Sequence, residues 1–413
     1  MMKYILKKYY LQFIVVVALA TSFGACSTMD EGYKEFLKDG EISYTGKIDS
    51  LHIFSGRNRV NVKGLFISDP KITECRIFWN SGSDSIVVPV VRTQGVDTLD
   101  VFIENLAENI YSFEVRTYDA LGNISIAVSS IGSVFGDNYQ ASLYNRPYLS
   151  SSVYKGDANS TLKVEYGNID LSTGVVGTQY VYTDVNDEEH VTTIPLADPS
   201  ALPYYKKASS FKYRTTFLPN ETAIDTFYVE YVTVDDVELV YVLNREIPFV
   251  SSDKSGRWGN LTDWTTNDAA KNHGGYGGWD SNSTGVFNIE SGWGSPSITN
   301  GKVYQTLTLE AGNYKFKCSP RAKNGGIDSG YTIPEDFVYL AVAEGTDLPD
   351  SNAGVLETDP TTLGFVRFEK TMTPDMFEIM FTLTETKTIS FGISTTQGQS
   401  RFCVIESFSL EKL

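Results

Sequence analysis

Apolar and polar residues alternate one by one along many short segments, and this pattern limits the fold more than any other feature. In residues 74–79, for example, Cys75, Ile77 and Trp79 occupy every second position. Because successive side chains of a β-strand point to opposite faces, such runs predict half-buried antiparallel strands. Gly, Asn, Asp and Pro between the runs predict the turns that join them.

The spacing of these runs predicts three β-domains. Several runs within residues 42–133 favour a two-sheet sandwich. Residues 134–250 repeat the order of the runs at an offset of about 100 residues, which predicts a second sandwich. A change of composition near Ser251 begins a third strand-rich segment, residues 251–413. We therefore expect an all-β chain.

The first 25 residues have the features of an export signal. Three lysines precede an apolar run at residues 11–20, which is too short for a membrane span of about 20 residues. Small residues then lead to Cys26, in a pattern that resembles a bacterial lipobox. We expect a lipoprotein signal peptide at residues 1–25, a lipid on Cys26 and a tether over residues 26–41.

The residues after Cys26 bear on the location of the chain. Ser27 is followed by Asp30 and Glu31, which resembles the surface-export signal of Bacteroidetes lipoproteins. This resemblance implies a lipid-anchored protein of the outer membrane that faces the cell exterior.

The charge of the chain excludes some partners. Lys and Arg number 34 against 51 Asp and Glu, which gives a formal net charge of −17. Nucleic acids and anionic polysaccharides would be repelled, so neutral glycans and cationic partners remain.

No enzyme signature is present in the sequence. The three histidines, His52, His190 and His273, lie far apart, and no catalytic or phosphate-binding motif surrounds them. We expect a non-catalytic protein.

Three cysteines remain after Cys26. Export permits disulfides, so Cys318 and Cys403 of the third segment could pair. Alternatively, these two and Cys75 are buried thiols, which the length of the chain favours.

Two further stretches resemble known domains. Residues 117–125 resemble the late-strand turn of fibronectin type III-like domains. Residues 301–316 and the closing strand at 404–410 resemble a galactose-binding-like jelly roll, the sandwich of many carbohydrate-binding modules. Together they resemble the surface lipoproteins of Bacteroidetes polysaccharide-utilisation loci, with two tandem fibronectin type III-like or immunoglobulin-like sandwiches before a terminal jelly roll.

The resemblance implies a glycan-binding lipoprotein that captures polysaccharide or oligosaccharide for a neighbouring importer and enzymes. An adhesive or structural envelope protein, whose jelly roll binds a protein partner, is the alternative. The aromatic platform of a glycan site would lie in a groove, whereas a protein partner would need a broad apolar patch.

Four of the five tryptophans lie in a Gly- and Asn-rich window between residues 258 and 293. Sugar sites combine aromatic faces with a few polar groups, and glycine-rich loops favour exposure. We expect Trp258 and Trp293 to pack in the core. The expected sugar-binding residues are Trp264, Tyr276, Trp279, Asp280, Asn282 and Arg321.

The resemblance also allows a structural calcium ion near the first and last strands of the jelly roll. Asp253 and Glu406 occupy roughly corresponding positions. Calcium takes about six to eight oxygen ligands, so these two carboxylates alone do not make a site.

Overall fold

The computed structural model describes residues 43–67, 69–323, 326–327 and 336–413. The expected signal peptide, Cys26 and the tether lie outside these residues, so the lipid anchor stays a prediction. Within the described ranges, no helix combines the length and the apolar character needed to cross a bilayer. Strands dominate the chain, which confirms the all-β prediction.

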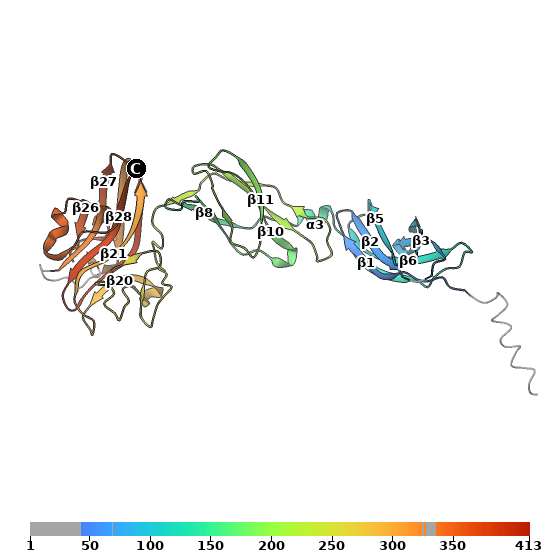
Figure 1. The fold of residues 1–413 in the computed structure, drawn as a ribbon, viewed down its shortest axis with the longest axis horizontal. Coiled ribbons are helices and arrows are strands. Elements are labelled where there is room, and N and C mark those ends of the chain that lie inside the picture. Colours follow the sequence, from blue (N-terminus) through green and yellow to red (C-terminus); the bar gives the residue numbers. More distant parts are fainter. Residues whose placement is uncertain (1–42, 68, 324–325, 328–335) are drawn as a thin grey trace, which may run out of the picture. The chain divides into compact units, whose positions relative to one another are not determined.

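Two antiparallel sheets form the first sandwich (Figure 1). Their strand orders are β1-β2-β5 and β4-β3-β6-β7, in the sandwich architecture that fibronectin type III and immunoglobulin domains share. The strands are β1 Asp49–Ser55, β2 Arg59–Phe66, β3 Ile72–Trp79, β4 Asp84–Pro89, β5 Asp97–Glu104, β6 Asn109–Asp119 and β7 Val128–Val134.

Alternation along these strands separates the core from the solvent face. Cys75 and Ile77 are fully buried between the sheets, and Trp79 packs against the same core. Phe113 and Val115 of β6 are buried in the same way. The residues between them on β3 and β6 therefore point away from the core.

The second sandwich follows the short helix α3 Asp137–Ala141. Its sheets have the orders β11-β10-β13-β14, with β15 on β13, and β12-β9-β8-β16. Buried tyrosines and phenylalanines dominate its core. The strands are β8 Tyr148–Tyr154, β9 Leu162–Tyr166, β10 Val175–Thr183, β11 Glu189–Pro195, β12 Ala201–Leu202, β13 Phe211–Phe217, β14 Phe227–Tyr228, β15 Val232–Val234 and β16 Glu238–Val240.

The third segment is a jelly-roll sandwich of two larger sheets, β17-β19-β20-β29-β22-β27 and β18-β21-β28-β25-β26. Aromatic and aliphatic side chains of both sheets fill the core between them. The strands are β17 Trp258–Asn260, β18 Thr265–Thr266, β19 Gly278–Asp280, β20 Val286–Ser291, β21 Ile298–Leu309, β22 Gly312–Pro320, β25 Phe337–Glu344, β26 Thr362–Arg367, β27 Glu378–Leu383, β28 Lys387–Gln397 and β29 Arg401–Lys412, and a small hairpin joins β23 Ala322–Lys323 to β24 Gly326–Ile327.

Two compact units contain the described residues. The first comprises residues up to 143 together with 172–175 and 217–228, and the second comprises 144–171, 176–216 and 229–413. Within the first unit, Arg59 holds Asp225 with two hydrogen bonds, at 3.0 Å from Nε and 2.7 Å from Nη2. This bidentate pair ties the segment 217–228 to β2.

The described cysteines Cys75, Cys318 and Cys403 are buried thiols. Burial raises the pKa of Cys75 to about 12 and that of Cys318 well above its ordinary value. Of the two alternatives for Cys318 and Cys403, the structure has the thiols and not the disulfide.

A tyrosine near the start of an interior strand closes the preceding turn in two of the sandwiches. The Tyr111 hydroxyl donates a hydrogen bond to the Ala107 carbonyl at 2.9 Å, and Tyr314 does the same to Glu310 at 2.9 Å. In immunoglobulin-like sandwiches such a tyrosine corner fixes the approach to the strand. Phe211 begins β13 of the second sandwich and has no hydroxyl.

Replacing Tyr111 with phenylalanine keeps the ring and removes the hydrogen bond. We expect the free energy of unfolding of the first sandwich to fall by about 1 kcal/mol, because the Ala107 carbonyl loses its donor. Urea unfolding of the full chain measures this change, with Tyr44→Phe as the control at an exposed tyrosine. Equal stability of Tyr111→Phe and the parent chain would mean that the hydroxyl does not hold the turn.

Candidate functional site

A pocket of about 380 Å³ lies on the solvent face of the six-stranded sheet of the jelly roll. We call it the Trp293 pocket. Its lining residues are Arg257, Asp280, Asn282, Val286, Asn288, Glu290, Trp293, Arg321, Phe402 and Val404.

The register of neighbouring strands brings the polar lining residues together. Asp280 on β19 lies opposite Val286 on β20, and Asn288 on β20 lies opposite Val404 on β29. Side chains directly opposite one another in antiparallel strands share a face of the sheet. The residues that alternate with them on β20, including Phe287, are buried in the core instead.

Arg257 organises the charges at one side of the pocket. Its guanidinium donates to both Asp280 oxygens, at 3.0 and 2.6 Å, and to Glu290 at 2.9 Å. Burial alone would raise the pKa of Asp280, but the hydrogen bonds that the carboxylate accepts, from Arg257 first, hold the pKa below its usual value. The carboxylate is therefore ionised near neutral pH and the arginine is fixed in place.

One buried polar atom in the wall of this pocket lacks a partner. Asn288 is almost fully buried, and its Nδ2 donates to Asp280 Oδ2 at 2.9 Å. Its Oδ1 accepts no hydrogen bond from the described residues. Unpaired buried acceptors of this kind are uncommon in folded proteins.

Trp293 stands on a tight turn at the edge of the pocket. Gly292, Trp293 and Gly294 all have positive φ angles, of 89°, 49° and 106°, and the turn is closed by hydrogen bonds between Gly292 and Ser295. The left-handed region is unfavourable for a tryptophan. The side chain is nevertheless 64% exposed, and the Phe402 ring lies 6.4 Å from it between centroids.

The expectation for Trp264 and Trp279 as exposed sugar platforms is wrong. Trp279 is 5% exposed and Trp264 is 7% exposed, and both belong to the jelly-roll core. Their indole N–H groups are also used, since Trp279 donates to Phe249 O at 2.8 Å and Trp264 to Leu243 O at 3.1 Å. The glycines before Trp279 did not keep its ring out of the core, because β19 turns Trp279 inward.

The other expected residues divide into two groups. Asp280, Asn282 and Arg321 do line one pocket. Tyr276 is half-buried and does not line it.

Two tryptophans expected in the core lie elsewhere. Trp258 is half-buried between the Arg257 guanidinium, at 4.4 Å, and the His273 ring, which stacks on it at 3.6 Å. Trp293 is exposed at the pocket, and sequence reasoning missed it. The signal was present in its two neighbouring glycines, which make a tight turn possible.

The carboxylates of Asp253 and Glu406, the expected calcium ligands, both accept hydrogen bonds from protein groups. Asp253 accepts hydrogen bonds from the Asn260 amide and side chain and from Ser251, and Glu406 accepts one from Arg321 at 3.0 Å. Neither carboxylate belongs to a group of three or more His, Cys, Asp or Glu side chains with ligand atoms within 4.8 Å, as far as the described residues go.

One group of this kind occurs among the described residues, at Asp184, Glu188 and His190 of the β10–β11 hairpin. Asp184 already accepts hydrogen bonds from the backbone of Glu188 and Asn186 and from His190. These bonds, the one from Glu188 first, lower the pKa of Asp184 to about 2. The carboxylate therefore serves the turn and offers little to a cation.

Truncation of the buried indoles should reduce stability and not only binding. We expect Trp279→Ala to lower the free energy of unfolding of the jelly roll by about 3–5 kcal/mol, because it leaves a cavity in the core. Trp293→Ala is the matched control and should change it by less than about 1 kcal/mol. Urea unfolding of both variants measures the difference, and similar losses for the two would contradict the assignment of core and surface.

The Asp280–Arg257 pair should make stability depend on pH. Because the folded-state pKa of Asp280 is lowered, its ionised form stabilises the fold above the unfolded-state pKa of about 4. This contribution is lost as pH falls through the folded-state pKa. We expect Asp280→Asn to be less stable than the parent at about pH 6, with a difference that shrinks below about pH 4, in urea unfolding at several pH values. A difference that does not change with pH would contradict this role.

Comparison with known proteins gives matches over two successive segments. Residues 26–227 match a family described as a domain of unknown function, DUF4998, and residues 243–392 match a second, DUF5013, described in the same words. No curated protein matches the chain.

Two solved structures of fibronectin-like modules align with about half of the chain. The FN1–FN3 domains of chicken CNTN1 share 11% identity over 47% of this chain and 68% of their own, with a TM-score of 0.29. The fibronectin(III)-like modules of Clostridium thermocellum CbhA share 11% sequence identity over 46% of this chain and 93% of their own, with a TM-score of 0.25. The sheets of residues 49–240 make the first two domains tandem fibronectin type III-like sandwiches. The sequence itself is similar to the two DUF families.

Proposed function

We propose that this chain is a non-catalytic glycan-binding protein and that the Trp293 pocket binds a neutral saccharide. The observation that carries the proposal is the combination of the exposed Trp293 ring with the polar side chains of Arg257, Asn282 and Arg321 in one pocket. A pyranose ring has an apolar C–H face and an edge of hydroxyl groups. The indole suits the face, and the polar side chains of the pocket suit the hydroxyl groups.

The charges of the pocket favour a neutral ligand. Arg257 is held by Asp280 and Glu290, and Arg321 is held by Glu406. No charge in the pocket is left for an anionic group, and the acidic chain as a whole would repel an anionic polymer. Fixed arginine and amide N–H groups still offer donors to the oxygens of a neutral sugar.

The lipid expected on Cys26 would hold this site at the outer membrane, facing the cell exterior. A single shallow pocket supports weak binding, and many copies on one surface would raise the apparent affinity for a long polysaccharide. The captured polymer would pass to a neighbouring importer and degrading enzymes. This is the role that the resemblance to polysaccharide-utilisation lipoproteins implies.

Replacing Trp293 with alanine should abolish most of the binding. We expect an affinity loss of about tenfold or more for a neutral polysaccharide, because tryptophans that contact a ligand carry a large share of its binding energy. Affinity electrophoresis of the full chain in a sugar-free detergent measures this, in gels that contain starch, xylan, galactomannan or mixed-linkage β-glucan. Tyr144→Ala, which removes an equally exposed aromatic ring outside the pocket, is the matched control.

If Trp293→Ala kept full affinity, the chain would bind glycan at a site other than the Trp293 pocket. A folded chain that binds none of the four polymers would contradict the proposal. That result would favour the alternative, an adhesive or structural lipoprotein with a protein partner.

A further inference from the structure

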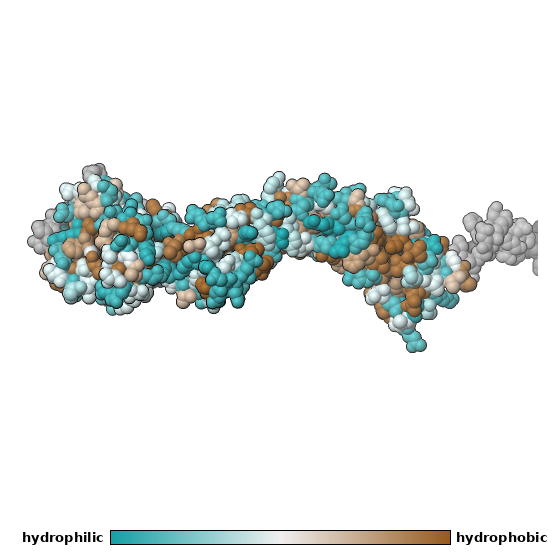
Figure 2. All heavy atoms as spheres, turned by 90° about the horizontal axis from the view of Figure 1, so that it is seen from above, coloured by the Kyte–Doolittle hydropathy of each residue, from teal (hydrophilic) through white to brown (hydrophobic). Residues whose placement is uncertain are grey.

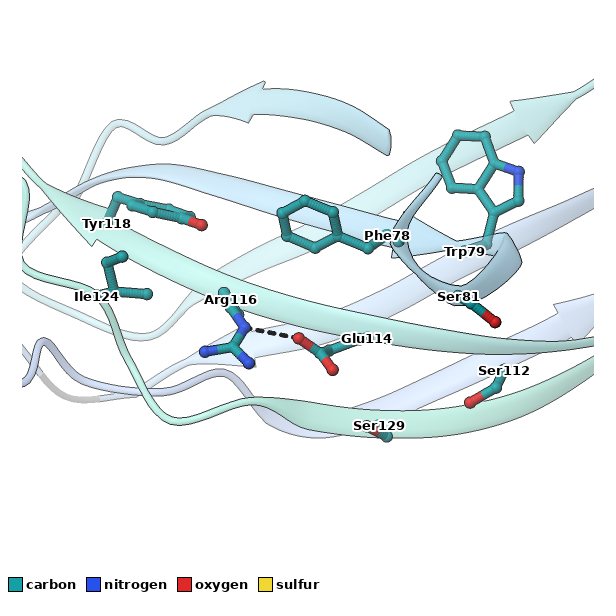
Figure 3. A pocket seen from close by; sticks show the side chains of 10 residues that line it. Phe78, Trp79, Ser81, Ser112, Glu114, Arg116, Tyr118, Ile124 and Ser129 are labelled. Carbon is teal, nitrogen blue, oxygen red and sulfur yellow. Dashed lines mark hydrogen bonds and ion pairs between the residues drawn. The ribbon is translucent and has the colours of Figure 1, made fainter. Parts of the chain in front are cut away.

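A second and larger hollow lies on the first sandwich. It has a volume of about 620 Å³ and is lined by residues of β3, β6 and β7 and of the adjoining loops (Figure 3). We call it the Phe78 groove. The lining residues used below are Phe78, Ser112, Glu114, Arg116, Tyr118 and Ser129.

Strand register explains why the surface is hollow there. Phe78 on β3 lies opposite Glu114 on β6, which lies opposite Ser129 on β7. Ser112 and Ser129 are short, whereas Phe78 and Tyr118 are large, so the serines form a floor beside raised aromatic rings. Figure 3 shows these side chains on one side of the sheet, with the Phe78 ring between Tyr118 and Trp79.

The polar groups of the groove are held in place and their charges cancel. Arg116 Nε donates to Glu114 Oε1 at 2.6 Å, and these are the two charged residues of the lining. Beside the groove, Arg76 forms an ion pair with Glu74 and lies over the Tyr118 ring, at 4.4 Å from its centroid. The ring is therefore fixed before any ligand arrives.

The two strands that carry most of the groove, β3 and β6, cannot bind a peptide by adding a strand. Strand addition needs a free sheet edge. β3 is paired with β4 and β6, and β6 is paired with β3 and β7, so both are interior strands. A ligand that lies over β3 and β6 is therefore recognised by side chains, whereas β7 is the edge strand of the sheet.

The groove and the Trp293 pocket share a composition. Each combines aromatic rings, arginines paired with carboxylates, and small hydroxyl or amide side chains, with no net charge among the lining residues. An apolar ligand would leave the serines and the ion pair of the groove without polar partners, whereas a saccharide offers both a C–H face and hydroxyl groups.

We infer that the Phe78 groove is a second binding site for a neutral saccharide, so that one chain binds a polysaccharide at two places. This inference rests on the proposed function of the Trp293 pocket, because the likeness of the two linings identifies the class of ligand. Phe78 stacks on a sugar face, and Ser112, Ser129 and the Arg116–Glu114 pair meet its hydroxyls.

Isothermal titration calorimetry of the full chain, in a sugar-free detergent, counts the sites. The probes are cellohexaose, xylohexaose, mannohexaose and maltohexaose. We expect two saccharides per chain for the parent and one each for Phe78→Ala and Trp293→Ala. Ser112→Phe, which fills the groove without removing an aromatic ring, should also bind one. Ile131→Ala, on the same sheet face but outside the groove, is the matched control and should bind two.

The outcomes separate the two sites. One saccharide per parent chain, unchanged by Phe78→Ala and Ser112→Phe, would overturn the groove and leave the Trp293 pocket standing. A single site that both groove variants remove and Trp293→Ala keeps would overturn the pocket and the two-site inference, and it would leave the groove as the one saccharide site. No binding of any hexasaccharide by the folded chain would overturn both.

Discussion

In most of the described strands one set of alternate side chains enters the core and the other set lies on the opposite face, although strands such as β25 are buried on both faces. Both candidate sites lie on strand faces whose side chains do not pack in the core. The neighbouring residues Trp279 and Asp280 illustrate the division, since the indole is buried in the jelly-roll core and the carboxylate lines the Trp293 pocket. On β3 of the first sandwich, Ile77 is core and Phe78 lines a groove. A shift of one residue in either strand would exchange these roles, so packing of the core also fixes the position of both candidate sites.

Balanced charge is the second constraint on these sites. The chain carries an excess of 17 acidic groups, yet each arginine that lines a hollow is held by a carboxylate. An unpaired guanidinium would attract any anion, and an unpaired carboxylate would attract cations. Paired groups instead offer N–H donors and oxygen acceptors in fixed directions, and because their charges cancel they attract few distant ions. Such surfaces discriminate by shape and hydrogen bonding, as recognition of an uncharged polyol requires.

Local sequence was enough to predict the strands but not the fate of the tryptophans. Alternation in residues 74–79 identified the buried Cys75 and Ile77, because side-chain direction in a strand is a local property. Whether Trp279 or Trp293 is exposed depends on the turn or strand that contains it and on the sheet that packs over it. Neither can be read from the neighbouring residues in the sequence. Glycine-rich flanks surround both residues. Around Trp293 they form a closed turn with positive φ angles, whereas around Trp279 they let the chain enter β19. The polar residues Asp280, Asn282 and Arg321, which were expected to bind sugar, line one pocket, but the aromatic residues expected beside them do not, and the tryptophan there is Trp293, which was expected in the core.

The left-handed turn at Trp293 has an evolutionary consequence. The conformation costs roughly 1 kcal/mol or more for a residue with a Cβ atom, and the core does not use the ring. Drift alone would favour glycine or asparagine at this position. An aromatic residue that is kept at position 293 would be kept for what its ring contacts. Trp279, in contrast, is needed for packing of the core whichever ligand is bound. Among descendants of this chain, variation at position 293 should therefore follow changes of ligand, and the scaffold beneath it can stay constant.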